Sequence, residues 1–388
     1  MNAASFDAVI VGGGIVGAAT AAACAKTGMH VALVERDVLG GGATAAGMGH
    51  IVVMDDSEAQ FELTRYSQVL WSRIAPELPS GTEYEMPGTL WLAADDEEMA
   101  EAERKQKFYR DRNVPAHLLT AQKIEELEPN LKLGLAGGLI VPGDAVLYPP
   151  AAALHLFHLA ETLGATLLLQ RSVTAMGSGR VLLDDGRELT APYVINATGA
   201  SAPHLSGNIP VKKRKGHLVI TDHYPGYVRH QLVELGYLKS AHSVASDSVA
   251  FNVQPRKTGQ ILIGSSRQYG DESANVDQEI LTAMLQRATA YLPSIGSLNA
   301  IRVWTGFRAA TPDKLPLIGP VAHDGTVWLA TGHEGLGITT SLATAELVAA
   351  AISGRQLPIP LDPYLPSRFE QHNSHSDSAK EPLCNGKA

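Results

Sequence analysis

Three glycines near the start of the chain have the spacing of a loop that binds a diphosphate. The segment Gly12-Gly13-Gly14-Ile15-Val16-Gly17 fits G-x-G-x-x-G, and an acidic residue, Glu35, closes the apolar run that follows. In such a loop Gly12 allows the tight turn, Gly14 lets the backbone approach a pyrophosphate, and Gly17 lets a helix pack closely on a strand. Glu35 can accept hydrogen bonds from a ribose diol. These residues predict a dinucleotide site.

The elements around this loop are those that must position it. Residues 7–11 form an apolar β-run, residues 18–26 an alanine-rich helix without a breaker, and residues 30–34 a second apolar run. The amino end of the helix offers N–H groups and the positive end of its dipole to phosphates. The alternative, a glycine-rich turn in an ordinary α/β protein, is disfavoured because every part of the unit is present in order.

Three further segments of small residues lie along the chain, at 40–50, 197–200 and 332–337. Glycine and alanine let the backbone come close to a flat or extended ligand. A single ligand that contacts four loops across the whole chain must be long, and FAD is such a ligand. The four loops therefore disfavour an NAD-dependent dehydrogenase. The competing interpretations are a flexible linker at 40–50 and a helix-initiating turn without a ligand at 332–337.

Length and composition set the broad class. The 388 residues suggest about two domains, and 45% hydrophobic with 18% charged residues is typical of a globular enzyme. The formal net charge is −9 without a basic stripe, which excludes nucleic acid as an expected partner. Cys24 and Cys384 cannot form a disulfide framework, and no Cys/His cluster indicates a metal. We see neither room for a signal peptide nor an apolar run of membrane-spanning length, so we expect a cytoplasmic protein.

The rest of the chain alternates between helical and β patterns. Helices are expected at 57–75, 95–112, 121 onward, 150–163, 277–291 and 339–352, and the charged helix at 95–112 is expected to be solvated. Short strands are expected at 88–93, 165–200 and 326–330, and residues 206–304 indicate a mainly antiparallel sheet. The polar, breaker-rich segment 371–388 is expected to be a disordered tail.

Several motifs together resemble one enzyme superfamily. They are ATAAGMGH at 43–50, GTLWLA at 88–93, VINATGA at 194–200, WTGFRAATPDKLPLIGP at 304–320, ATGHEGLGITTS at 330–341 and RF at 368–369. In this order they resemble the D-amino-acid oxidase superfamily of FAD-dependent amine oxidoreductases, over roughly residues 6–370. The resemblance implies an α/β fold of the glutathione-reductase type, with a Rossmann-like FAD-binding domain interleaved with an antiparallel-sheet substrate domain. It assigns 1–80, 141–205 and 305–370 to the FAD-binding domain and 81–140 and 206–304 to the substrate domain.

The reaction implied by the resemblance is oxidation of a C–N bond. A hydride passes from the substrate α-carbon to the flavin and leaves an imine, so that the flavin carries the chemistry and no catalytic triad is expected. Arg308 matches the arginine that pairs with the substrate carboxylate, for which a planar guanidinium is suited; the alternative is a structural pair with Asp313. The N–H groups at 335–337 can stabilise negative charge at the N1/C2=O edge of a reduced flavin.

The resemblance also places histidines and cofactor contacts. His50 and His333 lie in loops around the flavin ring and could hold the substrate amine or a flavin atom, although a loop histidine is often only a surface residue. Tyr237, Tyr269 and Arg267 could line or gate the pocket, or serve only as rim or packing residues. The residues expected to bind the cofactor are Gly12, Gly14, Ile15, Val16, Gly17, Glu35, Arg36, Ala43, Thr44, Gly47, Met48, Gly49, Val173, Thr198, Gly199, Gly332, Gly335, Leu336, Gly337, Ile338 and Thr339.

The substrate is inferred from resemblance alone. The motifs look closest to bacterial D-hydroxyproline dehydrogenases, glycine oxidases and the large subunit of hydrogen cyanide synthase, which favours cis-4-hydroxy-D-proline or another D-proline-like imino acid. Glycine, sarcosine and other D-amino acids are the alternatives, and a missing basic pair at 40–50 disfavours sarcosine. The FAD is expected to be noncovalent, because the only late cysteine is Cys384. Oxygen or a quinone or electron-transfer chain would accept the electrons.

Two expectations concern assembly and location. Relatives of this kind often act with small partner subunits, and a second hypothesis is a flavin-carrying subunit of a hetero-oligomeric amine dehydrogenase with little activity alone. The cytoplasmic expectation leaves room for peripheral association with a membrane.

Overall fold

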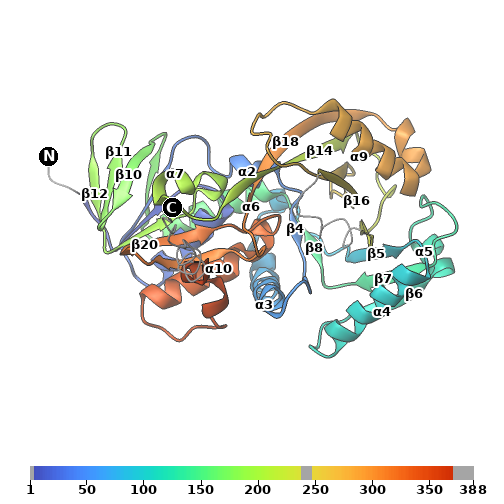
Figure 1. Ribbon diagram of the computed structural model, residues 1–388, viewed down its shortest axis with the longest axis horizontal. Coiled ribbons are helices and arrows are strands. Elements are labelled where there is room, and N and C mark those ends of the chain that lie inside the picture. Colours follow the sequence, from blue (N-terminus) through green and yellow to red (C-terminus); the bar gives the residue numbers. More distant parts are fainter. Residues whose placement is uncertain (1–3, 237–246, 370–388) are drawn as a thin grey trace, which may run out of the picture.

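The computed structural model describes residues 4–236 and 247–369. Figure 1 shows two lobes, one built around a mostly parallel sheet and the other around a larger antiparallel sheet. The expected tail at 371–388 lies outside the described residues. The mixture of parallel and antiparallel sheets confirms the predicted α/β fold class.

A six-stranded sheet holds the first glycine loop. Its strands, in spatial order, are β19 (Leu317–Val321), β20 (Asp324–Thr331), β13 (Tyr193–Asn196), β2 (Ala8–Val11), β3 (Val31–Glu35) and β9 (Thr166–Leu169). Every pair of neighbours is parallel except β19 and β20. The strands β2 and β3 are continuous apolar runs because both faces of this part of the sheet are covered. Strands from the beginning and from the last quarter of the chain thus lie in the same sheet.

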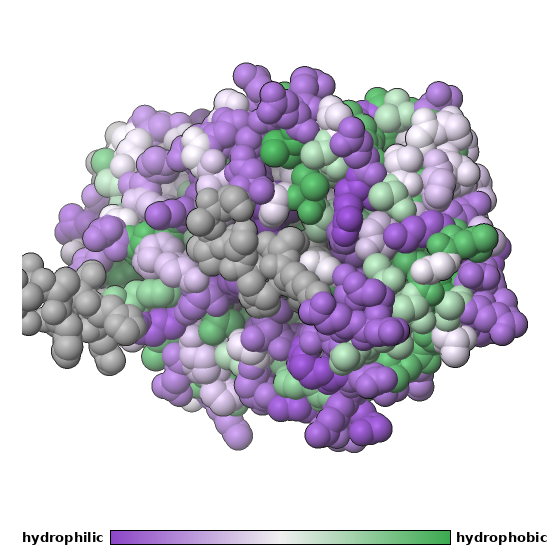
Figure 2. Space-filling model, turned by 45° about the vertical axis from the view of Figure 1, so that its right-hand side comes forward, coloured by the Kyte–Doolittle hydropathy of each residue, from purple (hydrophilic) through white to green (hydrophobic). Residues whose placement is uncertain are grey.

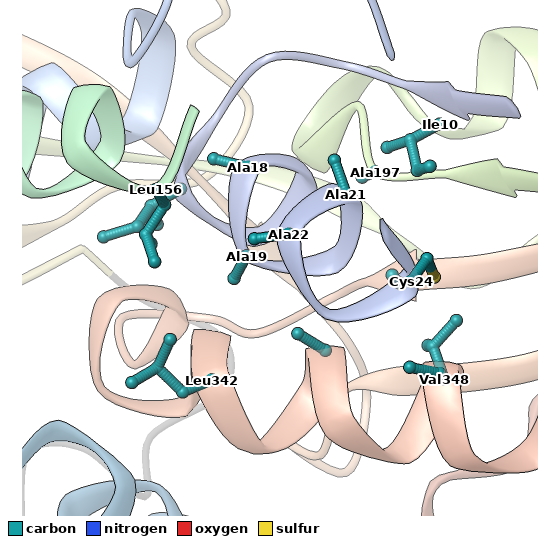
Figure 3. Packing of buried hydrophobic residues seen from close by; sticks show 14 of the residues in the cluster. Ile10, Ala18, Ala19, Ala21, Ala22, Cys24, Leu156, Ala197, Leu342 and Val348 are labelled. Atoms are coloured by element: carbon teal, nitrogen blue, oxygen red, sulfur yellow. The ribbon is translucent and has the colours of Figure 1, made fainter. Parts of the chain in front are cut away.

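Helices with small side chains pack on this sheet. Of these, α1 (Ile15–Lys26) and α10 (Gly337–Ile352) contact the sheet directly, whereas α6 (Pro149–Thr162) packs against α1 and α3 (Glu58–Ile74) packs against α10. Figure 3 shows alanines of α1 and Cys24 facing Leu342 and Val348 of α10, with Leu156 of α6 close by. Ala18, Ala21 and Cys24 have no exposed surface. The alanine-rich sequence therefore serves close helix packing, and Cys24 is a small core residue.

An eight-stranded sheet forms the other lobe. Its spatial order is β18 (Ala300–Ala310), β14 (Lys212–Thr221), β17 (Ile261–Arg267), β16 (Ser248–Pro255), β15 (Gln231–Glu234), β5 (Thr89–Ala93), β7 (Gly137–Val141) and β6 (His117–Thr120). All neighbours are antiparallel except β15 and β5. One face packs against α9 (Gln278–Tyr291). The proposed division into interleaved domains stays a prediction, and β18 continues in this sheet through Ala310, five positions after the expected boundary at 305.

Two small sheets and several short helices complete the described chain. A four-stranded sheet has the order β1 (Ala4–Ser5), β12 (Glu188–Thr190), β11 (Arg180–Leu183) and β10 (Val173–Gly177). The strands β4 (His50–Ile51) and β8 (Ala145–Val146) pair with each other. The remaining α-helices are α2 (Gly42–Ala46), α4 (Asp96–Arg110), α5 (Ala121–Leu127) and α7 (Pro203–Ser206).

The helix α4 corrects one prediction. Its charged sequence indicated a solvated helix, but Lys105 is fully buried and forms an ion pair with Asp55, which is itself 1% exposed at its side chain. The Lys105 ammonium lies 4.5 Å from the ring centroid of Trp91. The prediction was wrong for this face because Ala102, Lys105 and Tyr109 follow helical spacing and point to the core together.

The surface shows no segregation of apolar residues on the face drawn in Figure 2, where hydrophobic and hydrophilic side chains are interspersed. Among the described residues, no helix has both the length and the apolar character that a bilayer crossing requires.

Candidate active site

A cavity of about 700 Å³ lies where the two sheets meet. Its walls come from the carboxyl ends of β2, β3 and β13, from the loops at 40–50 and 332–338, and from β14, β16, β17 and β18. The four small-residue loops predicted from the sequence therefore converge on one space. Of the predicted site residues, those that line it are Gly12, Gly14, Ile15, Val16, Glu35, Arg36, Ala43, Thr44, Gly47, Met48, Gly49, His50, Val173, Thr198, Gly199, Arg308, His333, Gly335, Gly337 and Ile338.

Other predicted residues do not line the cavity. Gly17 lies behind the first loop, where a Cβ atom would come within 2.0 Å of the Gly12 carbonyl oxygen. Thr339 Oγ1 donates a hydrogen bond of 2.8 Å to the His50 carbonyl oxygen. Three further residues, Gly332, Leu336 and Arg267, are likewise absent from the lining.

The two tyrosines predicted in the substrate pocket have different outcomes. Tyr269 is not part of the cavity lining, and its hydroxyl oxygen accepts a hydrogen bond of 3.1 Å from Arg214 Nη1. Tyr237 lies outside the described residues. Of the two, only Tyr269 can be placed, and it lies away from the cavity wall.

The first glycine loop presents the amino end of α1 to the cavity. Gly14 precedes the helix in extended backbone, and Gly12 has a φ of +111°. A Cβ atom at Gly12 would meet the Ala197 carbonyl oxygen at 2.7 Å, so β2 and β13 can approach here only because the side chain is absent. The Ile15 N–H donates to Thr44 Oγ1 at 3.0 Å, which fastens the 40–50 loop to the helix. This arrangement is the one that a pyrophosphate requires.

Glu35 stands at the end of β3 with its carboxylate directed to the same loop. One oxygen accepts the Gly13 N–H at 2.5 Å and the other accepts the Asp37 N–H at 2.7 Å. Each carboxylate oxygen has a further acceptor position, so the group can also receive the hydroxyls of a ribose. Arg36 pairs with Asp37 at 3.1 Å on the exposed rim.

Neither loop histidine is superficial, since His333 is buried and His50 is half-buried with its Nε2 atom shielded from solvent. Burial, together with the nearby positive charge of Arg308 and against a hydrogen bond with Gln254 that raises it, lowers the pKa of His50 to about 4. Burial alone lowers the pKa of His333 to about 3, and its Nε2 atom lies 3.0 Å from Thr344 Oγ1. Both imidazoles are therefore neutral at neutral pH, so neither adds a positive charge to the cavity.

Arg308 reaches the cavity from β18. Its Nη1 atom donates to the Ser266 carbonyl oxygen at 2.9 Å. A Cβ atom at Gly216 would lie 2.5 Å from Arg308 Nη1, and one at Gly335 would lie 3.5 Å from Nε, so the guanidinium lies between two glycines. Asp313, the alternative partner considered from the sequence, instead binds Arg368 through both carboxylate oxygens at 2.7 and 3.1 Å.

Several lining residues were not found from the sequence. The substrate-sheet wall consists of Lys213, Gly216, Leu218, Asn252, Ser265, Thr305, Gly306, Phe307 and Ala309, and the loop adds Glu334. Gly216 and Gly306 are cross-strand partners; Gly216 begins a predicted strand and was a usable signal, whereas Gly306 lies beyond the predicted end of the antiparallel block at 304. Asn252 and Ser265 carried none, because alternation along a strand does not say which face borders a cavity.

Comparison with known proteins decides the family. The model of the FAD dependent oxidoreductase (DAO) family matches residues 7–351. The chain belongs to this family. It is therefore an FAD-dependent oxidoreductase that acts on C–N bonds, which confirms the predicted enzyme class and FAD as its cofactor.

Relatives with similar overall length support the assignment. The oxidoreductase is 28% identical to glycine oxidase from Geobacillus kaustophilus, over 92% of this chain and 96% of that protein. It is 27% identical to hydrogen cyanide synthase subunit HcnC from Pseudomonas aeruginosa, over 94% and 97%. Its fold matches the crystal structure of L-proline dehydrogenase from P. horikoshii with a TM-score of 0.84 and 25% identity, over 96% and 99% of the two chains.

The residues of the oxidoreductase fit FAD by their own geometry. The glycine cradle at 12–14, the amino end of α1, the Glu35 carboxylate and the turn at 335–337 all border the same elongated space. The helix α10 begins at Gly337, so its first N–H groups have no acceptor within the helix and can face the ring. Bound FAD supplies the hydride acceptor, whereas the chain supplies binding and orientation. Cys24 is buried in α1 and Cys384 lies outside the described residues, so noncovalent attachment stays a prediction.

Proposed function

We propose that this FAD-dependent oxidoreductase oxidises the C–N bond of a small or cyclic amino acid. The observation that carries the proposal is the position of Arg308, whose guanidinium lies on the cavity wall beside the Gly335 turn. A guanidinium binds a carboxylate at two points and holds the adjacent α-carbon in one orientation. Arg308 would thus fix the position of the substrate carboxylate. The 335–337 turn would face the edge of the flavin where negative charge develops on reduction.

Cis-4-hydroxy-D-proline is our first candidate substrate, followed by other D-proline-like imino acids. The similarity in fold to L-proline dehydrogenase supports a ring substrate. Glycine oxidation is the second candidate, and the relatives called glycine oxidase favour it. In both reactions His50 and His333 stay neutral, so that a hydrogen bond from either imidazole carries no added charge.

The electron acceptor and the assembly are further parts of the proposal. Oxygen would make the protein an oxidase, and a quinone or an electron-transfer chain would make it a dehydrogenase. The relative HcnC is described as a subunit of a synthase, which supports a search for small partner subunits. A cytoplasmic location, with or without peripheral membrane association, stays a prediction.

The decisive experiment is anaerobic reduction of the flavin in the purified holoprotein. Each of cis-4-hydroxy-D-proline, D-proline, glycine and sarcosine would be added while the flavin band at about 450 nm is followed. Fastest bleaching by the hydroxyproline supports the first candidate, and bleaching by glycine alone supports the second. No bleaching by any of the four would reject the catalytic proposal in favour of a flavin-carrying subunit.

A further inference from the structure

A buried ion pair stands next to the proposed carboxylate site. Glu334 Oε1 contacts Arg214 Nη2, and the two side chains are only 10% and 8% exposed. The Glu334 backbone N–H also donates to the Ala309 carbonyl oxygen at 2.9 Å. Both contacts join the 332–337 turn to the substrate sheet, which links the loop of one lobe to strands of the other.

Glu334 has a left-handed backbone conformation, which is unusual for a residue with a side chain. Its φ is +54°, in the left-handed region where glycine is the least strained residue. The turn already contains Gly332 at φ +79° and Gly335. Glycine would adopt this conformation with less strain than glutamate. The contacts of the Glu334 carboxylate must therefore offset the strain in its backbone.

The pair has a definite orientation relative to the cavity. Glu334 lines the cavity, whereas Arg214, which contacts Glu334 Oε1, does not. Arg214 is the cross-strand partner of Arg308, so the carboxylate is held close to the guanidinium proposed to bind the substrate. Glu334 Oε2 is buried and has no hydrogen-bond partner among the described residues.

The neighbouring positive charges have their own carboxylates. Lys213 Nζ binds Glu272 at 2.7 Å and Lys215 Nζ binds Asp271 at 2.5 Å. The basic run at 212–215 therefore does not present its full charge to the cavity. What the wall presents is a guanidinium, Arg308, with an acidic oxygen of Glu334 beside it.

We propose that Glu334 is a specificity-determining residue that recognises the nitrogen of the substrate and excludes a second carboxylate. The proposal rests on the proposed function, since it takes the substrate to be an amino acid. A zwitterion matches the wall, with its carboxylate at Arg308 and its N–H or ammonium group at Glu334 Oε2. A substrate with a second negative charge meets the Glu334 carboxylate instead. Repulsion between like charges within one cavity, at an effective dielectric constant of about 20, weakens binding on the order of 10- to 100-fold.

The test compares ligands of different charge on the FAD-loaded protein. The variants are Glu334→Gln, which removes the charge with little change in shape, and Glu334→Asp, which keeps it. Glu126→Gln is the matched control, because it removes one carboxylate from a surface pair with Lys123. Dissociation constants for acetate and iminodiacetate are measured from the perturbed flavin absorbance, and that for D-proline from rapid anaerobic reduction.

Glu334→Gln should lower the dissociation constants of acetate and iminodiacetate at least about tenfold from their wild-type values, whereas that of D-proline should not fall. Glu334→Asp and Glu126→Gln should keep the wild-type preference. Unchanged relative affinities for acetate, iminodiacetate and D-proline in Glu334→Gln, or equal changes in the Gln and Asp variants, would overturn the assignment. Glu334 would then serve only to hold the 332–337 turn against Arg214. If Glu334→Gln fails to retain FAD, Arg214→Gln serves instead: the uncompensated carboxylate should weaken acetate further, and tighter acetate would reject the role.

The two proposals fail separately. An absence of flavin reduction by every amino acid rejects the proposed function. The acetate and iminodiacetate dissociation constants do not depend on turnover, so an unchanged ratio between variants rejects the role of Glu334 alone.

Discussion

Replacing Arg308 by alanine would remove the guanidinium proposed to hold the substrate carboxylate. Two hydrogen bonds between charged groups contribute about 1.5–3 kcal/mol each, and loss of a buried charged partner costs about 2–5 kcal/mol. The guanidinium lies against Gly216, so its removal leaves room for water to solvate the carboxylate and offset part of the loss. We therefore expect about 3–4 kcal/mol, which corresponds to a loss of roughly 10²–10³ in kcat/KM.

The assay separates binding from chemistry. Rapid anaerobic reduction gives the limiting rate and the apparent dissociation constant, and flavin absorbance gives the FAD content. Because the lost contact exists before and during hydride transfer, most of the effect should appear as a higher KM with FAD retained. Arg308→Lys keeps the charge but not the planar fork and should fall between alanine and wild type. Arg302→Ala removes the same charge from an exposed position of β18 and should change little.

One substrate comparison would refute this reasoning directly. An amine without a carboxylate, such as pyrrolidine, cannot use Arg308, so its slower reduction should be the same in Arg308→Ala and wild type. An unchanged KM for the amino acid, or an equal loss with the amine, would remove Arg308 from the carboxylate role.

Three other perturbations follow from buried contacts. Lys105→Met leaves the Asp55 carboxylate with only the partly exposed Arg104 and should lower the free energy of unfolding by about 3 kcal/mol, against less than about 1 kcal/mol for Lys123→Met on the surface. Gly17→Ala forces a Cβ atom against the Gly12 backbone, so it should lower the free energy of unfolding by about 1–3 kcal/mol and reduce the FAD content. Gly325→Ala, whose Cβ atom meets nothing within 4 Å, should change neither. His333 is neutral when folded and takes up a proton near pH 6.5 when unfolded. Stability should therefore fall by about 2–3 kcal/mol between pH 7 and 4.5 from this group, and His333→Asn should flatten the fall. Urea unfolding, FAD content and the pH dependence of unfolding are the respective measurements. Equal destabilisation by the two lysine variants, full FAD retention in Gly17→Ala, or the same pH slope in His333→Asn would contradict these expectations.

The cofactor end of the site was predictable because its chemistry is local. The strand, loop and helix of residues 7–35 each have a sequence signal, and the loops at 40–50 and 332–337 are marked by glycines whose absence of a side chain is itself the requirement. That these loops converge on one cavity followed from a single assumption, namely that one long ligand contacts all of them. Arg308 followed from its motif rather than from any pattern of its own.

The substrate wall was much less predictable. Asn252 and Ser265 lie on strands whose alternation gives two faces but not the identity of the face toward the cavity. Glu334 appeared in a recognised glycine loop, yet its pairing with Arg214 joins positions far apart in the sequence and leaves no local trace. The ion pair between Lys105 and Asp55 was missed for the same reason.

The helical spacing of Ala102, Lys105 and Tyr109 was the signal that could have corrected the prediction for α4. A lysine within an apolar stripe of a helix should lead to a search for a buried acidic partner.

The order of strands in the parallel sheet has a consequence for how the protein is made. Strand β2 comes from the first residues of the chain, and its neighbour β13 pairs on its other side with β20, near the carboxyl end. The helix α10 packs directly against α1. A nascent chain that still lacks residues 317–352 would therefore leave one edge of β13 and the apolar face of α1 uncovered. Such contacts close late and slowly, and the exposed surface invites aggregation. During translation, this surface should stay exposed until residues 317–352 have left the ribosome.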